Sequence, residues 1–195
     1  MKKKNFLIAL ILASAISASA YAVTPANHDF GEVNFGCTVE EVKTVEKNST
    51  LTLETEDELI FTEVSGDTRS QNMYCFEEGK LVGALNNIVT DHDKLPEYFK
   101  DFANVDNYFK ELYGKPSQEI ITTDDETVLN DPEKLMEAIK SGEVMCCTIW
   151  RKSKYTITHI LASELPLEEM DTDVKQALKP SKIAHFVLGE IAGKE

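Results

Sequence analysis

The stretch FGCTVEEVK, residues 35–43, contains the signals that begin the first helix of the domain. Thr38 is typical of a helix N-cap, and Glu41, three residues later, completes the pattern of a capping box. Cys37 precedes the cap and Val42 is the fourth helical residue, which are the two positions of a hydrophobic staple. Valines recur at every third position and predict a short helix with one apolar stripe. The stretch therefore indicates a packing role, or a disulfide, for Cys37 rather than a reactive thiol.

Four segments with strand-like patterns follow this helix. They are expected at residues 50–54, 58–64, 69–76 and 81–89. Gly79 lies in the short connection between the last two and suits a hairpin turn that needs a positive φ. The connections are too short for crossovers, so the segments predict an antiparallel meander.

The longest predicted helix begins near Pro96, places phenylalanines on one face and ends at Gly114. A short strand over residues 118–122, a second helix opened by Asp131 and Pro132, and a final hairpin of residues 143–150 and 154–162 complete the pattern. This order predicts an α+β fold with helices packed on one face of a mostly antiparallel sheet, in two layers. We find no usable internal repeat in the sequence.

The N-terminus predicts export. Three lysines, an apolar run and an Ala-Tyr-Ala cleavage pattern are typical of a secretory signal peptide over residues 1–22. We expect the mature protein to be periplasmic or extracellular, without membrane insertion after cleavage. The remaining divisions are an extended lead-in over residues 23–34, one α+β domain over residues 35–165, and a C-terminal tail over residues 166–195 that docks on the domain. Within the tail, residues 167–178 fit a helical stripe, and residues 183–193 could form either helix or strand.

The protein is strongly acidic. Its 195 residues have a formal charge of −14, and removal of residues 1–22, which contain three lysines and no acidic residue, changes this to −17. Such a charge disfavours binding to nucleic acid or to an anionic membrane surface. A solvated acidic surface explains the charge, and a basic partner is the alternative.

One Cys/His pair is a candidate for chemistry. A symmetric hairpin loop over residues 151–154 would place Cys146 opposite His159 on neighbouring strands. Nucleophilic catalysis needs such a base, but it also needs a group that orients the histidine and a site for an oxyanion. The sequence offers neither, and the same strand face is apolar, so a buried histidine beside a buried thiol is the favoured interpretation.

The other candidate sites are weaker. A disulfide between Cys37 and Cys75 is conceivable, a bond between the adjacent Cys146 and Cys147 is disfavoured, and free thiols are an open alternative. The acidic clusters at residues 54–58, 91–93, 122–126 and 168–173 lack the spacing of a calcium loop, although weak calcium binding stays an alternative. We therefore predict no catalytic, cofactor-binding or metal-binding residues and no cofactor.

Three short motifs resemble a known class of proteins. In residues 35–43, Gly36, Thr38, Glu41 and Val42 match a glycine, polar cap, acidic residue and valine pattern, with Cys37 where methionine is usual. YCFEEGKLVGAL, residues 74–85, is similar to a strand pair of the same class, and YFKELYGKP, residues 108–116, to its helix end.

The class comprises small exported bacterial α+β domains and includes the outer-membrane-assembly lipoprotein SmpA, also called OmlA, and the β-lactamase inhibitor protein. The resemblance implies an α+β fold and protein binding, and it implies no catalytic residues. We therefore expect an exported, non-enzymatic binding protein of the bacterial cell envelope whose partner is another envelope protein. The alternatives are a cysteine-dependent enzyme that uses Cys146 and His159, and a weak calcium or small-ligand binding module.

Overall fold

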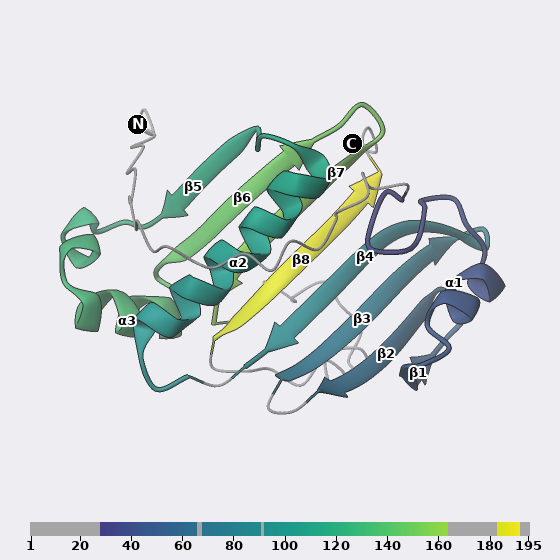
Figure 1. Ribbon diagram of the computed structural model, residues 1–195, viewed down its shortest axis with the longest axis horizontal. Helices are drawn as coiled ribbons and strands as arrows, with labels where there is room; N and C mark the ends of the chain where they lie inside the picture. The colour runs from purple at the N-terminus through teal and green to yellow at the C-terminus, as the bar shows by residue number, and fades with distance from the viewer. Residues whose placement is uncertain (1–27, 66–67, 91, 164–182, 192–195) are drawn as a thin grey trace.

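The protein has an α+β fold built on one antiparallel sheet. The computed structural model describes residues 28–65, 68–90, 92–163 and 183–191, which contain eight strands, three α-helices and one short 3-10 helix (Figure 1). The helices are α1 (Val39–Val45), α2 (Leu95–Tyr113), η1 (Glu126–Asn130) and α3 (Pro132–Lys140). The strands are β1 (Thr50–Glu54), β2 (Glu58–Ser65), β3 (Thr68–Glu77), β4 (Lys80–Val89), β5 (Gln118–Thr122), β6 (Met145–Arg151), β7 (Tyr155–Ala162) and β8 (Ala184–Ile191).

The start of α1 confirms the predicted capping box. The Glu41 backbone N–H donates to the Thr38 hydroxyl at 3.3 Å, and the Thr38 backbone N–H donates to the Glu41 carboxylate at 2.7 Å. Val42 is completely buried, and Cys37 packs against the same apolar cluster. The stretch that begins the domain thus acts as a folding signal whose cysteine is part of the packing.

The other local signals also form the expected elements. Glu78 and Gly79 both have positive φ, 51° and 71°, which closes the β3–β4 hairpin in a two-residue turn. Gly114 caps α2 at φ 76°, and the Asp131 carboxylate accepts two backbone hydrogen bonds at the start of α3. The predicted order of helices and strands is confirmed from α1 to β7.

The sheet consists of two halves that follow the same path. Its strand order is β1-β2-β3-β4-β8-β7-β6-β5, and every neighbouring pair is antiparallel. In each half, a helix precedes an outer strand, and three further strands step inward until β4 and β8 meet (Figure 1). The C-terminal half has η1 and α3 inserted after its outer strand. The sequence carries no usable repeat, so this correspondence is visible only in the topology.

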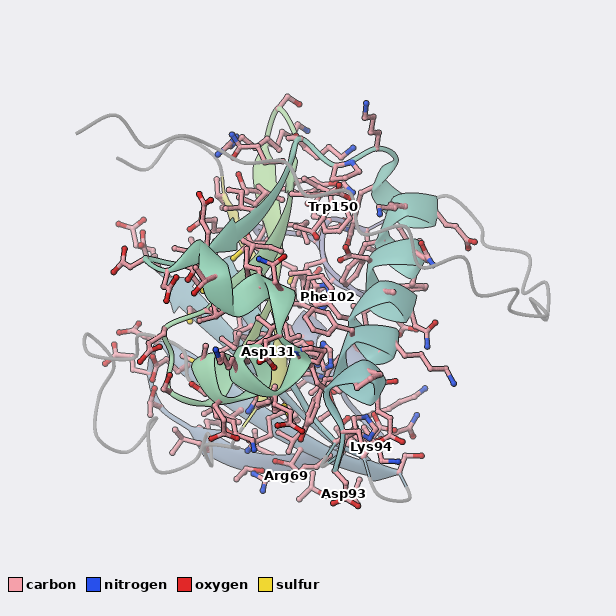
Figure 2. All side chains as sticks on the ribbon, turned by 90° about the vertical axis from the view of Figure 1, so that its left-hand side faces the viewer. Arg69, Asp93, Lys94, Phe102, Asp131 and Trp150 are labelled. Atoms are coloured by element: carbon pink, nitrogen blue, oxygen red, sulfur yellow. The ribbon has the colours of Figure 1, made fainter. Side chains whose placement is uncertain are left out.

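Two of the three apolar clusters among the described residues depend on the alternation of side chains along β3. Tyr74 and Phe76 on β3 join α1 and α2 in one apolar cluster, whereas Met73 and Cys75 point to the opposite face and join a second cluster. Trp150, which is fully buried, lies between α2 and the strands and donates its indole N–H to the Gly114 carbonyl (Figure 2). The sequence left open which set of β3 side chains faces outward, and the structure buries most of both.

The C-terminal residues complete the centre of the sheet. Residues 183–193 could form helix or strand on sequence grounds, and the structure makes Ala184–Ile191 a strand between β4 and β7. Gly189 of this strand lies under the ring of Phe30, which would come within 2.5 Å of an added Cβ atom. The expected signal peptide and the helical stripe of residues 167–178 lie outside the described residues, so those assignments stay predictions.

Candidate functional site

The β6–β7 hairpin does not pair Cys146 with His159. The turn is centred on residues 153–154 and is closed by a hydrogen bond from the Lys152 N–H to the Tyr155 carbonyl, so Thr148 lies opposite His159 and Cys146 lies opposite Leu161. A shift of two residues leaves all these side chains on the predicted face but changes which of them meet. The predicted cross-strand pair is therefore wrong. The prediction centred the hairpin turn on residues 151–154, and the observed turn is centred one residue later.

His159 instead pairs with a residue from α2. Its Nδ1 lies 2.6 Å from Oδ1 of Asp106, and the Thr148 hydroxyl donates to the other oxygen, Oδ2, at 2.7 Å. Asp106 is 6% exposed and His159 is not exposed at all. The ring of Phe102, which lies between α2 and the strands in Figure 2, stacks on the imidazole with centroids 4.2 Å apart. This is a closed polar cluster inside the core, and its chemistry is that of a buried ion pair or charge-assisted hydrogen bond.

A second histidine lies beside this cluster. His185 on β8 stacks on His159 with centroids 5.6 Å apart, and neither of its ring nitrogens has a hydrogen-bond partner among the residues that the structure describes. Burial, and then the neighbouring His159, lower the pKa of His185 from 6.5 to about 4. The imidazole is therefore held in its neutral form by the core.

The four cysteines are all free in the structure. Cys37 and Cys75 belong to apolar clusters on opposite sides of β3, so the conceivable disulfide between them is not formed. Burial, together with the neighbouring Cys147 and Asp106, raises the pKa of the Cys146 thiol to about 12. Burial, and then the Glu41 carboxylate, also raise the pKa of Cys37, which outweighs the lowering expected at a helix N-terminus.

The acidic clusters serve local structure where they are described. Glu54 pairs with Lys43 at 2.7 Å, and Asp125 accepts the Thr127 backbone N–H at the start of η1. His92 lies 2.7 Å from Asp101 on α2. Within the described parts of the chain, no group of three or more ligand-type side chains is placed to hold a metal ion. The cluster at residues 168–173 lies outside the described residues.

A groove between α1 and α2 is the feature that the sequence did not predict. Its floor is formed by β3, β4 and β8, which lie between the two helices in Figure 1, and its cavity volume is about 630 Å³. That volume falls in the range of ligand pockets, about 300–1,000 Å³. We call this feature the interhelical groove.

Acids, amides and aromatic rings line the interhelical groove. Its aromatic side chains are Phe30, Tyr74, Tyr108, Phe109 and Tyr113. Its polar side chains are Glu32, Glu46, Asn48, Ser49, Glu63, Asn72, Asn86 and Asn104. No lysine, arginine or histidine is among the described residues that line it. Apolar rings beside a few convergent polar groups are the usual composition of a ligand site.

A chain of hydrogen bonds organises the floor of the groove. The Tyr74 hydroxyl donates to Oε1 of Glu46 at 2.5 Å, and the Asn72 amide donates to the same oxygen at 2.8 Å. The Asn72 carbonyl in turn accepts from Asn86, whose amide also donates to Ser70 at 2.8 Å. Burial, and then the hydrogen bond to Glu46, raise the pKa of Tyr74, so its hydroxyl stays a donor.

One carboxylate oxygen of Glu46 has no hydrogen-bond partner among the described residues. Glu46 is only 7% exposed, yet Tyr74 and Asn72 both donate to Oε1, and nothing in the described parts of the chain donates to Oε2. It also forms no ion pair with a described residue, although a buried carboxylate is normally paired with a cation. The groove therefore contains a buried acid whose partners within the fold are neutral.

Sequence reasoning missed this site because its residues carry no shared motif. Glu46 follows α1 directly, while Asn72 and Asn86 are amides on interior strands, where amides are uncommon. Amides at neighbouring positions of two predicted strands, Gln71 and Asn72 on one and Asn86 and Asn87 on the other, were the signal that the sequence contained.

Comparisons with protein-family models, with curated proteins and with solved structures give no match to this chain. The resemblance to the class of small exported α+β domains therefore stays a prediction. Among the described residues, no helix is both long and apolar enough to cross a membrane.

Proposed function

We propose that this protein is an exported, non-enzymatic binding protein of the bacterial cell envelope, and that the interhelical groove is its ligand site. The observation that carries this proposal is the pairing of a ligand-sized cavity with a buried acid that is not neutralised within the described fold. In this proposal the helices cover one face of the sheet in a two-layer arrangement. The groove is then the part of that face that α1, with 7 residues, leaves uncovered.

The chemistry of the thiols supports binding over catalysis. Cys146 is 4% exposed and its pKa is about 12, so it carries almost no thiolate at neutral pH. Asp106 orients His159, the base that the enzyme hypothesis requires, but His159 is fully buried and lies opposite Thr148, whereas Cys146 lies opposite Leu161. A cysteine nucleophile needs a thiolate and a path for substrate. The groove offers a surface for recognition, with rings and amides in place of such a nucleophile.

The groove and its ligand can be tested with two matched substitutions on α2. Asn104 lines the groove, whereas Asn107, one turn further on and also exposed, does not. We expect immobilised protein lacking residues 1–22 to retain a specific envelope protein at moderate salt. Asn104→Trp should abolish this retention by filling the groove, and Asn107→Trp should leave it intact. Equal retention by both variants would show that the groove is not the binding site.

Export is tested separately by mass spectrometry of the protein recovered from the producing cell. Cleavage after Ala22 should leave a chain that begins at Val23 and that fractionates outside the cytoplasm. Recovery of the uncleaved chain in the cytoplasm would contradict the proposed localisation.

A further inference from the structure

The Oε2 atom of Glu46, which has no partner among the described residues, indicates what kind of ligand the groove binds. Isolated buried charges are costly, so proteins pair them or leave them to be paired by a ligand. Glu46 is more than nine-tenths buried and lines the groove, and its Oε2 atom accepts no hydrogen bond from the described residues. Tyr74 and Asn72 orient the carboxylate through Oε1 and leave Oε2 available.

The rest of the lining points to the same kind of ligand. Glu32 and Glu63 lie exposed beside the groove and add two negative charges, with no described cation in the lining to offset them. Tyr108 is 51% exposed, and its ring can stack on a planar cation. An arginine side chain suits this set better than a lysine. Its flat guanidinium stacks on rings and presents five donors to carboxylate and amide oxygens.

The charge of the whole protein favours a basic macromolecule over a free small cation, because the attraction grows with the number of positive charges on the partner. The chain has a formal charge of −14, and a field of that size accelerates encounter with a basic protein surface. We infer that the interhelical groove receives an arginine side chain from a basic segment of another protein, with its guanidinium donating to Oε2 of Glu46. This inference rests on the proposed function, because it takes the groove as the ligand site.

The inference predicts that the groove binds a charged side chain much more tightly than a neutral side chain of the same shape. The probes are the blocked tripeptides acetyl-Gly-Arg-Gly-amide and acetyl-Gly-citrulline-Gly-amide, since citrulline is a neutral counterpart of arginine. Titration followed by ¹H–¹⁵N NMR should show shifts of the Asn72 and Asn86 side-chain amides. We expect the arginine peptide to bind at least about tenfold more tightly, which is typical of a hydrogen bond between charged groups.

Glu46→Gln should lower the affinity for the arginine peptide to that of the citrulline peptide. Glu56→Gln is the matched control, since Glu56 is exposed in the β1–β2 connection outside the groove. Equal affinity for the two peptides, no binding of either, or unchanged binding by Glu46→Gln would each overturn the inference.

The same variants separate this failure from failure of the proposed function. Suppose that Asn104→Trp abolishes retention of the envelope protein while Glu46→Gln retains it fully. The groove is then the site, and the arginine inference is wrong. If Asn104→Trp also retains the envelope protein, the groove is not the ligand site, and the arginine inference that rests on it is wrong as well.

Discussion

Glu46 in the N-terminal half of the fold and Asp106 in the C-terminal half occupy comparable positions, but they differ in how their carboxylate oxygens are hydrogen-bonded. Each comes from the helical segment that precedes its four strands, and each binds the third strand of its half, at Tyr74 of β3 and at His159 of β7. Asp106 meets an imidazole and a hydroxyl, so both of its oxygens are used. Glu46 meets a phenol and an amide at one oxygen, and the other is left without a described partner.

Helix length accounts for this difference. The 7 residues of α1 extend about 10 Å and the 19 residues of α2 about 28 Å, at about 1.5 Å per residue. The longer helix crosses its half of the sheet and encloses Asp106 with Phe102 over the imidazole. The shorter helix ends at Val45, so Glu46, although it is only 7% exposed, lies in the wall of the interhelical groove beyond the helix. One arrangement thus produces a core cluster in one half and, in the other, a buried acid that lines a groove.

The largest effect that would sharpen the comparison is expected at Asp106. Asp106→Ala removes one partner of a buried pair and leaves His159 and Thr148 without it, at a cost of about 3–5 kcal/mol in the free energy of unfolding. Urea denaturation measures this loss. Asn107→Ala, at an exposed neighbouring position on α2, should change stability by less than about 0.5 kcal/mol. Similar stabilities for the two variants would contradict a structural role for the cluster.

The next largest effect is a pH dependence of stability that originates at His185 in the C-terminal half. The pKa of His185 is about 4 in the fold and 6.5 when unperturbed, so between these values the unfolded chain binds the extra proton. Stability should therefore fall as the pH is lowered from 6.5 toward 4, by up to ~3 kcal/mol. His185→Phe should flatten the slope between pH 6.5 and 5 in thermal unfolding. His28→Phe, at an exposed position, should preserve it.

The strands that join the two halves, β4 and β8, each contain a glycine. Substitution of these two glycines by alanine should lower stability by unequal amounts. A Cβ atom at Gly189 of β8 would meet Phe30 at 2.5 Å and Phe35 at 3.0 Å, whereas one at Gly83 of β4 would have no neighbour closer than 3.8 Å. We expect Gly189→Ala to cost about 1–3 kcal/mol through overpacking. Gly83→Ala should cost less than about 0.5 kcal/mol. Equal melting temperatures would show that the lead-in does not pack on β8 as described.

The smallest effect on stability is expected at Glu46. Glu46→Gln keeps an oxygen that can accept from Tyr74 and Asn72, and it removes a buried charge that has no cation among the described residues. The free energy of unfolding should therefore change by less than about 1 kcal/mol. A loss as large as that of Asp106→Ala, measured by the same urea denaturation, would make Glu46 a structural residue like Asp106. The contrast between the halves would then disappear.

Sequence reasoning reached most of the local structure and little of the candidate site. The capping box at Thr38, the turn at Gly79 and the helix stops were predicted because each depends on residues within four positions of one another. The pairing of Cys146 with His159 was wrong because a hairpin register depends on where the turn closes, which the loop residues left open. The strand character of Ala184–Ile191 was left undecided because an apolar run of that length suits a helix equally well.

The sequence by itself determined the helix caps, the turns, the meander and the acidic charge, since these follow from neighbouring residues and from composition. Only the tertiary structure joined β4 to β8, closed Asp106 on His159 across 53 positions, and placed Glu46 against Tyr74 across 28. Such contacts depend on how two helices of unequal length pack on one sheet. Whether a buried carboxylate has both oxygens paired, as in Asp106, or lines a groove with one oxygen unpaired among the described residues, as in Glu46, depends on which side chains pack around it, and no segment of the chain encodes that packing locally.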